Sequence, residues 1–204
     1  MAISSAPSAS SPDRDVELDT AALRVLAHPL RLNVLGLLRE RGPSTATRVG
    51  AELGITPGAA SYHLRRLATG GLIVEEPARG TGRERWWRSA HRQSVHEPAA
   101  APAERREAGR AYTRAVAVAA ADRLRRAAQE VALLPDEWLD ASAYGDFLLH
   151  LTPGDVDRMR GEIFEVIARY RNGDGEPSEG CAPVVVQVQA FPAAATALPP
   201  TGDA

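Results

Sequence analysis

Hydrophobic residues recur at helical spacing from Asp15 to Leu67, and turn-forming residues interrupt this pattern three times. The pattern predicts one helix that begins at Asp15 and ends before Pro29, and a second that runs from Pro29 to Gly42-Pro43. A third, short helix is expected to be capped by Ser44 or Thr45 and to end at Leu53. The residues expected to face inward in these three helices are Leu18, Ala22, Val25, Leu26, Leu30, Val34, Leu37, Leu38, Val49 and Leu53.

The stretch from Leu53 to Leu67 predicts a tight turn followed by a fourth helix. Gly54 suits a left-handed helix cap, Thr56 suits an N-cap, and Pro57 suits the first helical position. At 100° per residue, one face of this helix is apolar and the other is polar or small. The apolar face comprises Ala60, Leu64 and Leu67, and the other face comprises Gly58, Ser61, Tyr62, Arg65 and Thr69. Two helices joined in this way form either a helix-turn-helix or an ordinary surface αα-hairpin.

The hydrophobic period changes after the helix ends at Gly70-Gly71. Leu72–Glu76 and Arg85–Ala90 have β character, and the Gly-containing loop Pro77–Gly82 lies between them. This arrangement predicts a β-hairpin. Three helices followed by a hairpin with arginine at its tip predict a winged helix-turn-helix.

Charge is distributed unevenly along the chain. The formal net charge is −2, and all 24 basic residues are arginine. Residues 20–92 carry twelve Arg and five acids, giving +7, whereas residues 1–19 carry −3 and residues 93–204 carry −6. A basic block around a helix-turn-helix is typical of a surface that binds phosphates.

Several stretches of this region resemble the ArsR-type family of winged-helix transcription regulators. They are Leu26–Leu32, Thr56-Pro57, Ser61–Leu67 and Gly71–Val74, and the resemblance covers roughly Asp15 to Ala90. The resemblance implies a cytoplasmic homodimer that binds a palindromic operator in double-stranded DNA, usually as a repressor, and that responds to a signal.

Two departures from the family pattern refine this expectation. The metal-sensing members carry cysteines in the third helix, where this chain has Thr45, Thr47 and Gly50, so a soft metal is not expected as the signal. Gly58 and Ala59 stand where members often have polar residues, which puts more weight on Ser61, Tyr62 and Arg65. The full set of expected DNA-binding residues is Thr56, Pro57, Gly58, Ala59, Ser61, Tyr62, His63, Arg65, Arg66, Arg79, Arg83 and Arg85.

A polar and Ala/Pro-rich linker is expected at residues 93–102, followed by a long helix from about Ala103 to Leu134. Apolar and small residues recur along this helix at heptad-like spacing. Together with Val25 they form the expected dimer interface, which comprises Val25, Thr113, Ala117, Ala120, Leu124, Ala127 and Val131. The alternative is that the helix packs on its own winged domain.

Beyond Pro135, which is expected to break the long helix, the pattern predicts a small β–α–β unit. Residues 143–151 are expected to form a strand, Thr152 to cap a helix that runs to about Tyr170, and Val184–Phe191 to form a second strand. The inward stripe of the helix is expected to be Val156, Met159, Ile163, Ile167 and Tyr170. A minimal winged domain does not need this unit, which is therefore expected to sense the signal or to stiffen the dimer.

Other candidate sites give weak signals. The five histidines follow no zinc-binding spacing, and no phosphate-binding glycine loop or catalytic constellation is evident, so no enzyme activity, metal site or cofactor is expected. The lone Cys181 fits a reducing compartment. The N-terminus lacks the features of a signal peptide, and no apolar run is long enough to span a membrane. Trp86 and Trp87 should lie on opposite strand faces, with one packed on the core and one free for a partner.

The sequence thus predicts a mainly α fold with a small β component. The expected regions are a disordered tail at 1–15, a winged helix-turn-helix domain at 16–92, a linker at 93–102, a dimerisation and sensing region at 103–191, and a disordered tail at 192–204. The expected function is that of a sequence-specific, dimeric, cytoplasmic DNA-binding repressor that responds to a non-metal signal, with an unidentified small-molecule effector. The alternative is a winged-helix module that binds another protein and no operator.

Overall fold

The computed structural model describes residues 15–79, 84–91, 93–95, 102–170 and 179–193. The chain forms two compact units, unit 1 from Met1 to Ala132 and unit 2 from Leu133 to Ala204. The expected tails, up to residue 14 and from residue 194, and residues 96–101 of the expected linker lie outside the described residues.

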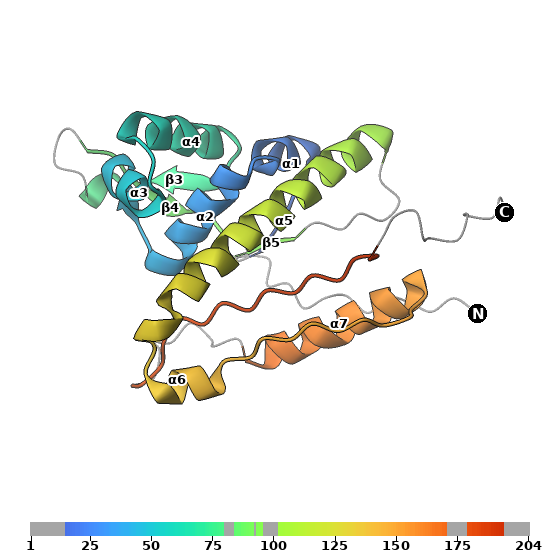
Figure 1. Ribbon diagram of the computed structural model, residues 1–204. Coiled ribbons are helices and arrows are strands. Elements are labelled where there is room, and N and C mark those ends of the chain that lie inside the picture. Colours follow the sequence, from blue (N-terminus) through green and yellow to red (C-terminus); the bar gives the residue numbers. More distant parts are fainter. Residues whose placement is uncertain (1–14, 80–83, 92, 96–101, 171–178, 194–204) are drawn as a thin grey trace. The chain divides into compact units, whose positions relative to one another are not determined.

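Unit 1 contains the four predicted helices, and all but the first lie close to the predicted bounds (Figure 1). They are α1 Thr20–Leu26, α2 Pro29–Arg41, α3 Ala46–Leu53 and α4 Pro57–Thr69. Of the two caps expected for α3, Thr45 is the one that the structure uses, and Thr56 caps α4 as predicted. The Thr45 side chain accepts the backbone N–H of Arg48, and the Thr56 side chain accepts that of Ala59. Within α2, Leu35 is also buried and Leu30 is only half-buried, so the inward face is displaced from the predicted one.

The predicted helical start at Asp15 is wrong. Residues Asp15–Glu17 form strand β1, which pairs in parallel with β5, Gln93–Val95. The Asp19 carboxylate accepts the Ala22 N–H at 2.7 Å and so caps α1. An N-cap residue has extended backbone, so the helix cannot continue upstream of it. The strand β5 also occupies the start of the expected linker.

The predicted hairpin is present, and it belongs to a three-stranded antiparallel sheet. The hairpin strands are β3 Ile73–Glu75 and β4 Trp86–Ser89, with a 3₁₀ turn, η1, at Pro77–Arg79. The third strand, β2 at Ser44–Thr45, pairs with β4, giving the order β2-β4-β3. A two-residue strand is too short to show hydrophobic periodicity, which is why the sequence analysis missed it.

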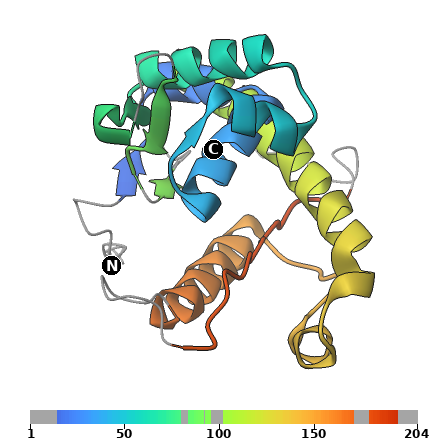
Figure 2. The same cartoon turned by 90° about the vertical axis from the view of Figure 1, so that its left-hand side faces the viewer.

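Helix α5, Ala103–Glu130, packs along α1 and α2 and ends in a 3₁₀ turn, η2 Val131–Leu133. Figure 2 shows the helix passing behind the winged elements. Its buried residues, which include Ala108, Ala115 and Ala119, are small, so the helix axis lies close to its neighbours. Two ion pairs add to the packing, Arg24–Glu104 at 2.6 Å and Arg123–Glu40.

The β–α–β prediction for unit 2 is only partly right. The predicted helix is present as α7, Pro153–Arg169, with a complete capping box between Thr152 and Asp155. Residues 143–151 and Val184–Phe191, however, form no strand (Figure 1). A strand requires a hydrogen-bonding neighbour, and among the described residues neither stretch has one. A short helix that the sequence analysis did not predict, α6, covers Asp136–Ala141.

We predict that Gly50→Ala destabilises unit 1, because a Cβ at Gly50 would lie 2.8 Å from the backbone oxygen of Ile55. Alanine otherwise favours helix over glycine, so the expected loss of about 1–3 kcal/mol in unfolding free energy would come from the clash alone. The matched control is Gly58→Ala on α4, where the added Cβ meets nothing closer than the Thr56 hydroxyl at 4.0 Å. Urea unfolding of both variants checks this, and equal stability of the two would contradict it.

Candidate nucleic-acid interface

The turn between α3 and α4 is held by backbone geometry. Gly54 has left-handed backbone angles, with φ 65° and ψ 34°, as the sequence analysis expected. The Ile55 N–H donates to the Gly50 carbonyl oxygen at 2.9 Å. Because Gly50 is buried and has no side chain, the turn folds directly onto α3. The second helix therefore leaves the first at a fixed angle, which is the geometry of a helix-turn-helix.

The apolar face of α4 anchors that helix in the core. Ala60, Leu64 and Leu67 are each completely buried, as predicted. They belong to a cluster that also contains Val34 of α2 and Val49 of α3. Burial of two leucines contributes about 1.5–3 kcal/mol each, so α4 is held firmly by this face. Its other face is consequently free to contact a partner.

That outward face carries most of the residues predicted to bind DNA. Thr56, Pro57 and Gly58 are exposed at the start of the helix, and Ala59 and Ser61 are half-buried. Tyr62 is 52% exposed. Arg65 and Arg66 are exposed in the following turn. Hydroxyl, phenol and guanidinium groups thus lie on one side of a rigid helix.

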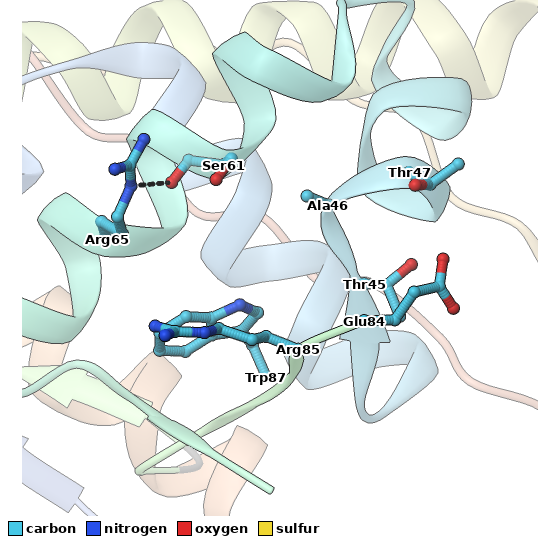
Figure 3. A pocket seen from close by; sticks show the side chains of 8 residues that line it. All are labelled: Thr45, Ala46, Thr47, Ser61, Arg65, Glu84, Arg85 and Trp87. Carbon is cyan, nitrogen blue, oxygen red and sulfur yellow. Dashed lines mark hydrogen bonds between the residues drawn. The ribbon is translucent and has the colours of Figure 1, made fainter. Parts of the chain in front are cut away.

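The guanidinium of Arg65 is oriented by its own helix. Its Nε donates to the Ser61 carbonyl oxygen at 3.2 Å (Figure 3). Arginine has five N–H donors, so the four on the terminal nitrogens remain available for a ligand. These are the donors that a planar, two-pronged contact requires.

A cavity of about 380 Å³ lies beside Arg65, between α3, α4 and the start of β4 (Figure 3). Two arginines, Arg65 and Arg85, contribute to its wall, and one acid, Glu84, partly offsets their charge. The complete lining is Thr45, Ala46, Thr47, Ser61, Arg65, Glu84, Arg85 and Trp87. The lining thus includes hydroxyl and guanidinium groups, which are the kinds of group that contact phosphates.

The wing, which comprises β3, η1 and β4, presents arginines at the other edge of this surface. The Nε atom of Arg79 lies 3.3 Å from Oε1 of Glu76, and the Nε atom of Arg85 lies 3.8 Å from Oε1 of Glu75. Both arginine side chains are more than half exposed, so these ion pairs are weak and can be exchanged for contacts with a ligand. Arg83, the remaining arginine predicted in the wing, lies outside the described residues.

A contact that the sequence did not predict joins the wing to the helix-turn-helix. The guanidinium of Arg48 on α3 lies 4.7 Å from the ring centroid of Trp86 on β4, within cation–π range. Trp87 faces the other way and is buried in the core, as the predicted alternation of the two tryptophans requires. The alternation indicated that one tryptophan would be free, but it could not identify Arg48 as its neighbour.

His63 faces inward and so differs from its neighbours among the predicted DNA-binding residues. It is 8% exposed, and its ring centroid lies 5.0 Å from that of His28, the N-cap residue of α2. Desolvation lowers the pKa of both imidazoles below the usual 6.5. The neighbouring His28 and Arg31 lower the pKa of His63 further, and Arg31 also lowers the pKa of His28. Both rings therefore favour the neutral form, and His63 packs α4 against α2.

The predicted dimer-interface residues fall into two groups. Thr113, Ala117, Leu124 and Ala127 are exposed, and Ala120 and Val131 are half-buried. At 100° per residue they lie on a different side of α5 from the buried Ala108, Ala115 and Ala119, so one side of the helix packs on its own unit while Thr113, Ala117 and Leu124 stay exposed. Val25 instead lies in the core, where Gly70 approaches it so closely that an added Cβ would lie 3.2 Å from its side chain.

The remaining candidates stand apart from this surface. Cys181 is exposed in unit 2. Among the residues that the structure describes, no three His, Cys, Asp or Glu gather in a way that could hold a metal ion. No single described helix is long and apolar enough to cross a membrane; α1 and α2 reach that length and composition only together, as a pair bent by 96°.

Residues 26–76 match a family of helix-turn-helix domains, which includes ArsR-type regulators. The match spans α2, α3, α4 and β3. No curated protein matches the chain significantly. A helix-turn-helix domain indicates DNA-binding transcriptional regulation, and this domain contains the outward face of α4 described above.

We predict that unit 1 loses stability as the pH falls below about 6.5. The pKa values of His28 and His63 are lower in the folded chain than the usual 6.5, so the unfolded chain takes up protons first. The stabilising effect of the neutral pair is complete above pH 6.5 and is lost as the pH falls through 6.5 towards the folded-state pKa values. Urea unfolding between pH 7.5 and 5.5 measures this. His63→Leu should give a shallower pH dependence, and a dependence as steep as that of the unaltered chain would refute the assignment.

Proposed function

We propose that this protein is a dimeric, sequence-specific DNA-binding repressor of the ArsR type that responds to a non-metal signal. The observation that carries the proposal is the outward face of α4, where Ser61, Tyr62 and Arg65 lie on a helix whose other face is buried. A helix of this kind enters the major groove and reads base edges with its outward side chains.

The positions of α4 and the wing suit them to different kinds of DNA contact. Arg65 is held on a rigid helix with its terminal donors available, which suits a two-pronged contact with guanine. Arg79 and Arg85 lie at the wing in weak, exposed ion pairs, which suits contacts with phosphates. Phosphate contacts position a protein on the duplex, whereas base contacts select the sequence.

The non-metal signal is supported by what occupies the positions of the metal-binding cysteines. Thr45 is 2% exposed and caps α3, and Gly50 has no room for a side chain. Both positions therefore have structural roles, and none of Thr45, Thr47 and Gly50 offers a thiolate to a soft metal.

The dimer is proposed to form through the free side of α5. Small residues such as Ala117 and Ala120 allow two helices to approach closely, and Leu124, 52% exposed, adds apolar surface. Two copies joined in this way would present two α4 helices to the two halves of a palindromic site.

We predict that Arg65→Ala and Arg85→Ala weaken DNA binding in different ways. Arg65→Ala should lower affinity for a selected site by about 1–3 kcal/mol while leaving binding to scrambled DNA nearly unchanged, because a base contact is lost. Arg85→Ala should weaken both and reduce the slope of log affinity against log salt by about one, because a phosphate contact is lost.

The selected site would come from enrichment of random double-stranded DNA on the full chain, and titrations at several salt concentrations would compare the variants. An equal loss on both DNAs for Arg65→Ala would make Arg65 a phosphate contact and leave specificity to other groups. If enrichment yields no preferred sequence and the full chain binds no DNA, the interaction-module alternative replaces the proposal.

We predict that Ala117→Arg raises the dimer dissociation constant by about 100-fold, since a charge would be placed in a closely packed seam. Ala117 is exposed in the single chain, so folding should not suffer. The control is Val118→Arg, one residue along the same helix and on a different side, at a position that is 46% exposed. Sedimentation velocity measures both variants; an unchanged constant for Ala117→Arg would exclude this side of α5 as the interface.

A further inference from the structure

Unit 2 exposes far more apolar surface than unit 1. Twenty large hydrophobic residues among those described are exposed; four lie in unit 1 and sixteen lie between Leu133 and Phe191. Five of the sixteen are aromatic, with exposed fractions between 55% and 83%; they are Tyr144, Phe147, Phe164, Tyr170 and Phe191. At about 200 Å² for each whole aromatic side chain, these five alone expose on the order of 700 Å².

Exposed apolar surface of this extent is typical of a protein that associates with a partner. The largest apolar patch on a typical monomer is about 300–600 Å², and each side of a standard protein–protein interface buries about 800 Å². Summed over their separate positions, the five aromatic side chains of unit 2 thus expose nearly as much area as one side of such an interface buries, before the exposed leucines and valines are added. Unit 1 has no comparable apolar surface among its described residues to cover them, because its exposed large hydrophobics are the scattered residues Tyr62, Val74, Val118 and Leu124.

The two extended stretches of unit 2 have strand-like sequences but no strand neighbour. In Val184–Phe191, residues Val184, Val186, Val188 and Ala190 alternate with Val185, Gln187, Gln189 and Phe191, so one side is wholly apolar and the other is mixed. Residues 143–151 carry a comparable run of Tyr144, Phe147, Leu148, Leu149 and Leu151. Among the described residues, none forms a ladder with either stretch. Their backbone donors and acceptors are thus available for pairing.

Helix α7 is also only partly covered. Of its predicted inward stripe, Val156, Met159, Ile163 and Ile167 are half-buried, but Tyr170 is exposed, so that part of the prediction is wrong. Phe164 and Val166 beside the stripe are exposed as well. A helix whose apolar arc is partly covered, between two unpaired strand-like stretches, resembles half of a folded core. Obligate homodimer interfaces have this character, because they resemble a domain core that has been cut in two.

We propose that a second copy of this chain completes unit 2, supplying the missing strand neighbours for residues 143–151 and Val184–Phe191 and covering the exposed margins of α7. A second copy is always present at the same stoichiometry, and a two-fold axis gives each copy the same contacts. The inference is independent of DNA binding, and it adds an interface in unit 2 to the one proposed on α5.

The decisive measurement uses the unaltered chain. Copies with labelled valine and leucine methyl groups are refolded together with unlabelled copies, and isotope-filtered nuclear Overhauser spectra then detect only contacts between different copies. Contacts between copies at Val184, Val186, Val188 or Leu148 are expected. Contacts within one copy only would show that these stretches pair in their own chain, and contacts between copies confined to α5 would show that α5 alone joins the dimer; either result overturns the proposal.

A matched pair of variants measures the energetic contribution. Val186→Asp places a charge on the wholly apolar side of its stretch, whereas Gln189→Asp places the same charge three residues away on the mixed side. Sedimentation should show a dissociation constant at least 100-fold higher for Val186→Asp and within threefold of the unaltered chain for Gln189→Asp. A Val186→Asp dimer as tight as that of the unaltered chain overturns the proposal. A failed DNA-binding experiment leaves it standing, since neither measurement involves DNA.

Discussion

The close approach of the turn to α3 at Gly50 is the constraint on which the rest of unit 1 depends. Only a residue without a side chain permits the Ile55 backbone to hydrogen-bond to the helix at that point. The bond fixes where α4 begins and in which direction it runs. The buried residues Ala60, Leu64 and Leu67 then set its rotation, and that rotation determines which side chains face outward. Backbone sterics at one glycine thus determine what α4 can offer to a ligand.

Helix α5 shows how one element can serve two surfaces. Alanines on one side bring the helix close to α1 and α2 inside unit 1, and others, such as Ala117, remain exposed on another side. From the sequence, intrachain packing and dimerisation were alternatives, because the heptad-like spacing predicts a single apolar seam. A helix rich in alanine has small residues on several sides, so periodicity alone cannot separate the side that packs from the side that stays free.

The features that the sequence predicted well are those set by local chemistry. The caps at Thr45, Thr56 and Thr152, the left-handed Gly54 and the buried face of α4 each depend on residues within a few positions of one another. The features that it missed depend on distant partners.

Strand β2 forms because Ser44 and Thr45 pair with β4. Likewise, the cation–π contact of Arg48 depends on the position of Trp86 in β4. In unit 2 the predicted strand at Val184–Phe191 is wrong, because alternation of side chains does not supply the neighbour that turns an extended segment into a strand. For the candidate site, the exposed positions of α4 were predictable, whereas the inward packing of His63 against His28 was not, because it depends on how α2 crosses α4.

Thr45 connects the wing to α3. Its backbone pairs with Trp86 in the wing, and its hydroxyl accepts the backbone N–H of Arg48 at the start of α3. The guanidinium of Arg48 lies over the ring of Trp86 and so adds a second contact between α3 and the wing. The wing and α3 are therefore linked both through Thr45 and through the Arg48–Trp86 contact. A displacement of the wing would therefore reach the first turn of α3 through Thr45 and Arg48, by a route that does not pass through α4.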